Sequence, residues 1–572
     1  MDLLLRGGLL IDGTGAPARP ADVAVEQDRI AKVDAAGRLD PQPRTQVVDL
    51  DGLVVAPGFI DVHTHYDAQI LWDGGVSPSP LHGVTTVVGG NCGFTIAPVA
   101  PATTDYVRRM LARVEGMPVA SLEAGLDFRW STFGEWLDVL EGAVAVNAGF
   151  LVGHSTVRRL VMGEASVGEP AGADQLDAMT AVVHRSLAEG ALGFSTSRSG
   201  SHRDHHGDHV PSLHATVDEV LALAATVRDH EGTILEIVPS SQLFFDDPVV
   251  ELMTAMSLAG RRTLNWNLLG TLGGEAKIRN KLAASDHAVA RGARVVPLTL
   301  PDPQALRLSF AVGFVYDMLP GWAEVMAMSP ADKLRALADP DVRRRLEASS
   351  ADGPWWANWA DTTFGETFAA ANAGWEGRTA GQVAAERGIG VFDALCDVVV
   401  ADDLRTGLVP RTVDDTDEHW RMRAELWRDP RVVIGGSDAG AHLDTIWTFN
   451  CISSLVGPSV RDRGLIDLEE AVRLVTDVPA RMYGLTGRGR LEPGWHADVV
   501  VFDPDRLGPE PVRAVTDLPA GGWRLSGGAV GVDHVLVNGV EIVERAEYTG
   551  ARPGVVLRSG RDTRTVPIPA DG

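Results

Sequence analysis

The sequence has few cysteines, no long apolar run and no excess of basic residues. Three cysteines among 572 residues are too few for a disulfide framework, and their odd number fits a reducing cytoplasm. No apolar run reaches the length that crosses a bilayer. The net charge is −26 without a basic stripe, which argues against nucleic acid and anionic membranes as partners. We therefore expect a cytoplasmic protein that acts on a small molecule.

The two ends of the chain share a strand-like pattern. Residues 1–56 and the C-terminal part alternate apolar and polar residues between Gly, Asp and Pro, and Asn538-Gly539 is typical of a hairpin turn. Because chain ends often lie close together, these segments can pair. We predict one small composite β domain from residues 1–56 and 483–572.

Between these ends, short β-rich runs alternate with helical stretches. About eight such runs, from GFIDVHTH to RVVIGGSD, indicate an α/β fold with a parallel sheet closed into a barrel over residues 57–482. An open doubly wound sheet is the alternative, but no Gly-rich dinucleotide turn follows the first strand. Residues 301–430 are Trp- and Asp-rich, and we expect this insertion to cover a site. Its aromatic residues can form a wall for substrate or an ordinary helix-packing core.

The first β-rich run carries two histidines. In GFIDVHTHYD, His63 and His65 stand two residues apart, so both side chains point to one side of a strand. Two imidazoles at this spacing can share one divalent metal ion. Half-buried structural histidines are the alternative, but the preceding Pro-Gly break and Asp61 favour a metal site.

Two later segments place reactive groups directly after a strand. Cys92, within GGNCG, can be a metal ligand, a nucleophile or only a small buried apolar residue. Asp438, in GGSDAGAH, can do acid–base work on a metal-activated water or can cap a turn. His442 follows at the end of the same segment. These groups extend the candidate site beyond the first strand.

A polar segment after ALGFSTS contains five histidines between residues 202 and 214. Clusters of metal ligands normally need scaffold strands to hold them, so we interpret most of this segment as a solvated loop. His202 and Arg203 lie nearest the strand. We predict these two residues as the substrate contacts of the segment.

Taken in order, these segments resemble the amidohydrolase superfamily. GFIDVHTH, GVTTVVGGNCG, GSDAGAH and LTGRGRLEPGWHADVVVFDPD span nearly the whole chain, and GNCG is similar to the N-acyl-D-amino-acid deacylase (D-aminoacylase) branch. The resemblance implies a distorted TIM (β/α)8 barrel with a composite β-sandwich, and metal-assisted hydrolysis at the barrel mouth. It also implies that His63, His65, Cys92 and Asp438 surround one or two Zn²⁺-like ions, with Asp438 as the acid/base residue.

The chain departs from the superfamily at three strands. The superfamily usually supplies a histidine from each of the fifth and sixth strands, and often a modified lysine from the fourth. Here TILEIVPSS and TLNWNLLG contain no histidine, and AGFLVGHSTVRR has no lysine but carries His154. Glu236 can replace a lost ligand, whereas Asn265 and Asn267 more readily hold substrate or water. The metal site is therefore either built differently from the usual deacylase site or weakened.

The preferred prediction is a metal-dependent hydrolase that cleaves the amide bond of an N-acyl amino acid or a related small amide with a metal-activated water. The predicted substrate-binding residues are His154, Arg198, His202, Glu236, Asn265, Asn267 and His442. Two alternatives stay open. The same barrel can catalyse another reaction (ester, lactam or carbamate cleavage, or a non-hydrolytic conversion), or it can be an inactive binding or scaffold protein. A homo-oligomer is compatible with all three.

Overall fold

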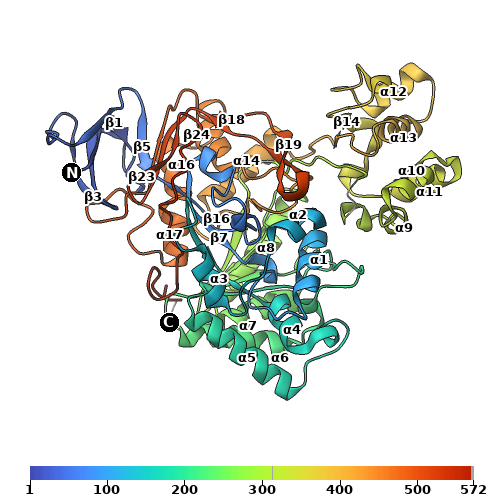
Figure 1. The fold of residues 1–572 in the computed structure, drawn as a ribbon, viewed down its shortest axis with the longest axis horizontal. Helices are drawn as coiled ribbons and strands as arrows, with labels where there is room; N and C mark the ends of the chain where they lie inside the picture. Colours follow the sequence, from blue (N-terminus) through green and yellow to red (C-terminus); the bar gives the residue numbers. More distant parts are fainter. Residues whose placement is uncertain (312–313, 569–572) are drawn as a thin grey trace.

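The computed structural model describes residues 1–311 and 314–568. Figure 1 shows a central α/β body, a β region on one side that contains both blue and red segments, and a helical lobe on the opposite side. The chain is therefore organised around one central unit, with the two ends of the sequence brought together beside it.

The central body is built on short parallel strands that pair in chain order. β6, β7 and β8 form one sheet, and β9, β10, β11, β12, β13 and β16 form a second. A single residue, Leu151, separates β8 from β9, and a parallel bridge between Thr64 and Ala439 joins the segments that follow β6 and β16. The bounds of these strands are β6 Phe59–Asp61, β7 Val84–Gly89, β8 Asn147–Phe150, β9 Val152–Gly153, β10 Gly193–Ser197, β11 Ile234–Val238, β12 Leu264–Trp266, β13 Val295–Thr299 and β16 Val433–Ile434.

Helices connect these strands and cover the sheet, as expected for parallel pairing. They include α1 (Thr104–Val114), α3 (Phe133–Leu140), α4 (His154–Met162), α5 (Ala173–Ala188), α6 (Val217–Ala225), α7 (Asp247–Gly260), α8 (Gly274–Val289), α14 (Asp417–Arg428), α16 (Leu468–Leu474) and α17 (Asp477–Tyr483). Helix α6 starts where the Thr216 side chain accepts a hydrogen bond from the Glu219 N–H, and α7 starts at Asp246 in the same way. None of the helices in the described ranges is long and apolar enough to cross a membrane.

The two ends of the chain pair into one sheet. Its strand order is β24-β23-β22-β17-β5-β1-β2-β3, with β4 paired to β1. β5 and β17 pair antiparallel and so join the N-terminal strands to the C-terminal strands. Asn538 and Gly539, both with positive φ, make the turn between β22 and β23. The strands are β1 Leu3–Leu10, β2 Arg19–Glu26, β3 Arg29–Ala35, β4 Gln46–Asp49, β5 Val54–Pro57, β17 Val499–Phe502, β22 Val532–Val537, β23 Val540–Glu544 and β24 Glu547–Tyr548.

The segment after residue 550 differs from the prediction that residues 483–572 belong to the β domain. Val556 forms a parallel bridge with Ala148 of β8, and Leu557 packs in a core that includes Ile234 of β11. The Thr563 hydroxyl donates to the Gly232 carbonyl at 2.7 Å. The apolar run GVVLR therefore packs on the strands of the central body, where its apolar side chains are buried.

The insertion forms a lobe with its own apolar core. It contains α9 (Ala323–Met326), α10 (Pro330–Ala338), α11 (Pro340–Ser350), β14 (Thr363–Phe364), α12 (Ala380–Arg387), α13 (Val391–Ala401) and β15 (Leu408–Val409). Trp322 stacks on Trp359 with ring centroids 5.4 Å apart, and Phe310 and Phe392 contact the same pair edge-on or tilted. These aromatic residues were expected to form either a wall for substrate or a helix-packing core, and in the structure they pack in the core of the lobe.

A buried polar network ties the end sheet to the central body. The Asn147 side chain of β8 donates to Asp498 at 3.0 Å and accepts from Asn538 at 2.9 Å. Asp498 also pairs with Arg488, and both side chains are at most 5% exposed. A buried guanidinium that loses its only carboxylate partner keeps its full desolvation penalty.

We therefore expect Asp498→Ala to lower the free energy of unfolding by about 3–5 kcal/mol. Denaturant titration followed by circular dichroism measures this loss. Glu544→Ala is the matched control, because Glu544 is an exposed carboxylate of β23 in the same sheet. The control should change the stability by less than about 0.5 kcal/mol. A similar small effect for both variants would show that the network does not stabilise the junction.

Candidate metal centre

His63 and His65 follow β6 at the carboxyl end of the central strands. Their Nε2 atoms lie 3.4 and 3.8 Å from the Cys92 Sγ atom. Tetrahedral Zn²⁺ with ordinary bond lengths separates a nitrogen and a sulfur ligand by about 3.6 Å. All three side chains are buried, and their ligand atoms lie within 4.8 Å of one another. The spacing of these three donors therefore fits one divalent cation.

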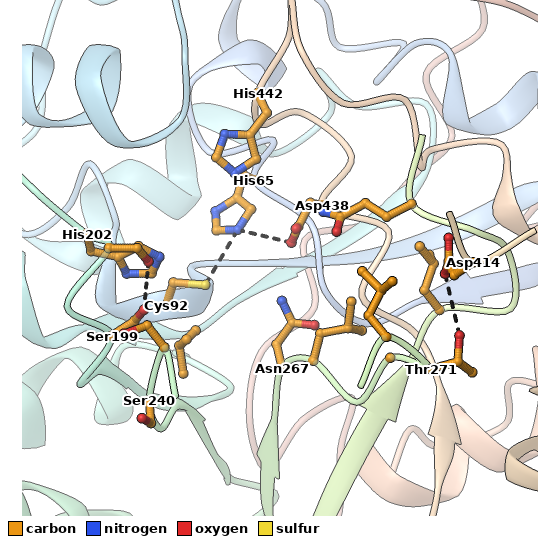
Figure 2. A pocket seen from close by; sticks show the side chains of 18 of the residues that line it. His65, Cys92, Ser199, His202, Ser240, Asn267, Thr271, Asp414, Asp438 and His442 are labelled. Carbon is orange, nitrogen blue, oxygen red and sulfur yellow. Dashed lines mark hydrogen bonds and ion pairs between the residues drawn. The ribbon is translucent and has the colours of Figure 1, made fainter. Parts of the chain in front are cut away.

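Asp438 faces the same point from the far end of the strand order. Its Oδ1 atom lies 3.3 Å from the Nε2 atom of His63 and 3.8 Å from that of His65 (Figure 2). The Asp438 N–H donates to the His63 carbonyl at 3.2 Å, and the Ser437 hydroxyl donates to Asp61 at 2.5 Å. These bonds fix the loop after β16 against the segment after β6. The carboxylate and the two imidazoles predicted from the sequence thus lie together.

The backbone around Cys92 is shaped to aim its sulfur at the two histidines. Cys92 has φ +58°, a left-handed conformation that a cysteine rarely adopts. The preceding Gly90 also has positive φ, and a Cβ atom there would lie 2.2 Å from the Leu151 carbonyl oxygen. The Cys92 N–H donates to Glu236 Oε2 at 2.9 Å, which holds the turn in place. Strain of this kind at a reactive side chain is typical of functional sites.

Two buried glutamates face the outer nitrogens of the histidine rings. Glu236 Oε1 lies 4.0 Å from His63 Nδ1, and Glu115 Oε1 lies 3.4 Å from His65 Nδ1. Metal-bound histidines usually direct their second N–H at a carboxylate, which orients the ring. The sequence analysis missed Glu115, because it follows helix α1 and belongs to no strand or motif.

Burial opposes ionisation of the acidic groups around the centre. Burial raises the pKa of Glu236 to about 7, and it raises the pKa of Glu115 and of the Cys92 thiol well above their usual ranges. Burial also opposes ionisation of Asp438, but the hydrogen bond and charge of His63 lower its pKa to about 2. Among the described residues, no hydrogen-bond partner is found for Glu115 Oε1 or Glu236 Oε1. A cation at the centre would stabilise the ionised forms of these carboxyl and thiol groups.

The centre opens into a cavity of about 410 Å³. His65, Cys92 and Asp438 form part of its wall, and three predicted substrate-binding residues line it as well: His202, Asn267 and His442. The Asn267 amide nitrogen lies 3.4 Å from His63 Nε2, and His202 Nδ1 lies 2.8 Å from the Ser197 hydroxyl. Figure 2 shows these side chains converging from several elements on one space.

The other four predicted substrate-binding residues, His154, Arg198, Glu236 and Asn265, do not line this cavity. Both ring nitrogens of His154 are engaged, by Thr196 at 2.9 Å and by Glu219 at 3.0 Å. Arg198 donates to backbone carbonyls between residues 212 and 215, and the Asn265 amide donates to the carbonyl of residue 235. In the structure these three side chains bind other groups of the protein, and their contact with substrate stays a prediction. Glu236 contacts Cys92 and His63 and does not line the cavity.

This combination of an α/β body and a buried His/His/Cys/Asp centre is that of a metal-dependent hydrolase. The chain belongs to the amidohydrolase family, whose model matches residues 46–543. It is 29% identical to a D-aminoacylase of Alcaligenes xylosoxydans xylosoxydans over 97% of each chain. It is 30% identical to an N-acyl-D-aspartate deacylase of the same organism over 98% of this chain and 95% of the relative.

A solved structure supports the same assignment. The N-acyl-D-glutamate deacylase of Bordetella bronchiseptica, complexed with zinc and a phosphonate mimic of the tetrahedral intermediate, aligns with a TM-score of 0.66 and 25% identity. The alignment covers 98% of this chain and all of that chain. The predicted resemblance to the amidohydrolase superfamily and its D-aminoacylase branch is thereby confirmed.

Glu115→Gln should weaken zinc binding about 10–100-fold, because a neutral amide orients and polarises His65 less strongly than a carboxylate does. Competition with a chromophoric chelator measures the affinity. Glu123→Gln, at an exposed position of α2 (Val119–Gly125), is the matched control and should bind zinc like the parent protein. Equal affinities for the two variants would contradict a role for Glu115 at the metal.

Zinc affinity should also fall as the pH falls. Burial raises the pKa of the Cys92 thiol, so binding through a thiolate must displace a proton. One displaced proton weakens binding about tenfold for each pH unit on the acid side of that pKa. Cys92→Ala should bind zinc more weakly and with a shallower pH dependence. An unchanged slope in this variant would remove Cys92 from the ligand set.

Proposed function

We propose that this protein is a zinc-dependent N-acyl-D-amino-acid deacylase, which hydrolyses the amide bond of a small N-acyl amino acid. His63, His65 and Cys92 would hold the ion, with Asp438 beside it. One observation carries the proposal: these four side chains converge from different parts of the chain on one point, and three of them, His65, Cys92 and Asp438, line one cavity. The full-length similarity to D-amino-acid deacylases supports the substrate class.

The residues of the cavity divide the reaction between them. When bound, Zn²⁺ supplies a Lewis acid that polarises a carbonyl and lowers the pKa of water. Asp438 is ionised, so its carboxylate takes a proton from the attacking water and later delivers it to the departing nitrogen. His202 and His442 line the same space and are the candidate hydrogen-bond donors to the oxyanion.

We also infer that the central strands form the distorted TIM barrel that the sequence predicts. Counting β8 and β9 as one position gives eight positions, and the bridge between Thr64 and Ala439 supports closure of the ring. We propose a β-sandwich arrangement for the sheet formed by the two chain ends. A cytoplasmic location remains part of the proposal and is supported by three free, buried cysteines.

A second candidate function keeps the same centre but changes the bond that is cleaved. Glu236, Asn265 and Asn267 occupy the two strands where the superfamily usually supplies histidines. Such a ligand set is compatible with cleavage of an ester, a lactam or a carbamate. We rank it second, because the chain aligns with deacylases over nearly its whole length. The inactive scaffold loses support, because the centre opens directly into a cavity.

Replacement of Asp438 by asparagine should lower kcat for N-acetyl-D-amino acids about 10²–10⁴-fold, since the amide cannot take the proton from water. Turnover is measured on a panel that includes both enantiomers, and the zinc content of each preparation is determined in parallel. Asp505→Asn, at an exposed position, is the control. Esters or lactams that are cleaved while every N-acyl amino acid is inert would favour the second candidate function.

A further inference from the structure

The cavity has a second end, away from the metal centre. Figure 2 shows His202 and Cys92 on one side of the space and the Thr271–Asp414 pair on the other. The charged side chains on its wall are Glu115, Lys277, Asp302, Asp414, Arg423 and Asp438. Two of these, Glu115 and Asp438, belong to the metal centre. Whether the other end can bind an anion therefore depends on its two cations, Lys277 and Arg423.

Lys277 is a buried cation on the wall of the cavity, and the negative charge of Asp414 acts on it. It lies in the first turn of α8 and is 7% exposed. Its Nζ donates to the carbonyls of Gly270 at 3.2 Å and Leu272 at 2.7 Å, which uses two of its three N–H bonds. No carboxylate of the described residues forms an ion pair with it. Burying an ammonium group in this way is costly unless an anion completes its shell.

The other cation on the wall is already neutralised. Arg423 pairs with the Asp414 carboxylate and also donates to the Asp414 carbonyl at 2.7 Å. Burial lowers the pKa of His202 to about 4 and also lowers that of His442, so both imidazoles are neutral near pH 7. Among the described residues of this wall, Lys277 is thus the cation left to meet a substrate anion.

The position of Lys277 suits an anchor for substrate. The Gly270 and Leu272 carbonyls that hold its ammonium belong to the loop that follows Asn267, and Asn267 contacts His63 of the metal centre. The Lys277 ammonium would attract a substrate carboxylate to this end of the cavity. Held there, the substrate directs its amide at the metal centre.

We propose that Lys277 binds the carboxylate of the amino-acid half of the substrate. Because the wall offers one unneutralised cation, we further infer that the enzyme prefers N-acyl amino acids with uncharged side chains over N-acyl-aspartate and N-acyl-glutamate. This inference rests on the proposed deacylase function. It assigns to Lys277 a direct contact with substrate and a role in specificity.

Lys277→Met tests the contact against a substrate that lacks the carboxylate. The variant should lower kcat/KM for N-acetyl-D-methionine about 100-fold, because a buried charge-assisted contact is lost. It should change kcat/KM for the corresponding N-acetyl amine, which lacks only the carboxylate, by less than about threefold. An equal loss on both substrates would overturn the inference, since the carboxylate would then not be the partner of Lys277.

Lys281→Met is the matched control. Lys281 lies one turn further along α8 and is 6% exposed, but its ammonium sits over the Phe245 and Trp266 rings at 4.5 and 5.6 Å and does not line the cavity. This variant should treat the two substrates alike. A carboxylate-dependent loss in Lys281→Met equal to that in Lys277→Met would overturn the proposal. If Lys277→Met does not fold, Lys277→Gln takes its place in both comparisons.

Binding separates failure of this inference from failure of the proposed function. Calorimetric titration of N-acetyl-D-methionine into zinc-loaded Asp438→Asn should give measurable binding that Lys277→Met abolishes. If binding depends on Lys277 but the parent protein turns over no N-acyl amino acid, the deacylase function is overturned and the carboxylate site stands. If turnover and binding do not change in Lys277→Met, only the carboxylate site at Lys277 is overturned. Equal kcat/KM for N-acetyl-D-aspartate and N-acetyl-D-methionine would overturn the single-carboxylate preference.

Discussion

The contact between the first and the last central strand is the constraint on which the rest of the site depends. The bridge from Thr64 to Ala439 and the bond from the Asp438 N–H to the His63 carbonyl bring residues from opposite ends of the central body together. Without that contact, the two imidazoles and the carboxylate would belong to separate strands with no common ligand. This contact between the segments after β6 and β16 is therefore what makes the chemistry available.

Burial at this contact requires that the acidic groups of the centre be neutralised. The centre collects a thiol and several carboxyl groups in a space from which water is largely excluded, and burial alone opposes their ionisation. Protons or a metal cation can satisfy this requirement. Because two imidazole nitrogens and a sulfur already stand at zinc-like separations, a cation satisfies it without rearrangement. Glu236 contributes twice, since it faces His63 and also fixes the Cys92 turn.

The parts of the site that the sequence predicts are those that sit on strands. Strand periodicity and Gly-rich turns placed His63, Cys92 and Asp438 at one edge of the sheet, and there the structure has them. Glu115 follows the C-terminus of α1 and Lys277 lies in the first turn of α8, so each opposes the helix dipole, but neither belongs to a strand pattern or a motif. His154 also follows a strand, but its ring is turned toward Glu219. The fold class and the pairing of the chain ends followed from periodicity, whereas the core-forming role of the tryptophans required tertiary contacts.

The two ends of the cavity differ in charge, and this difference links the fold to substrate selectivity. One end carries the acidic metal centre on the loops after β6, β7 and β16, and the other carries a lysine held by the loop after β12. An N-acyl amino acid has a matching polarity, since its carbonyl seeks a Lewis acid and its carboxylate seeks a cation. The absence of histidines from β12 is compatible with this arrangement. Asn267, which contacts His63, and the loop that holds Lys277 both follow β12. The strand that lost a metal ligand thus leads directly into the segment that orients the substrate.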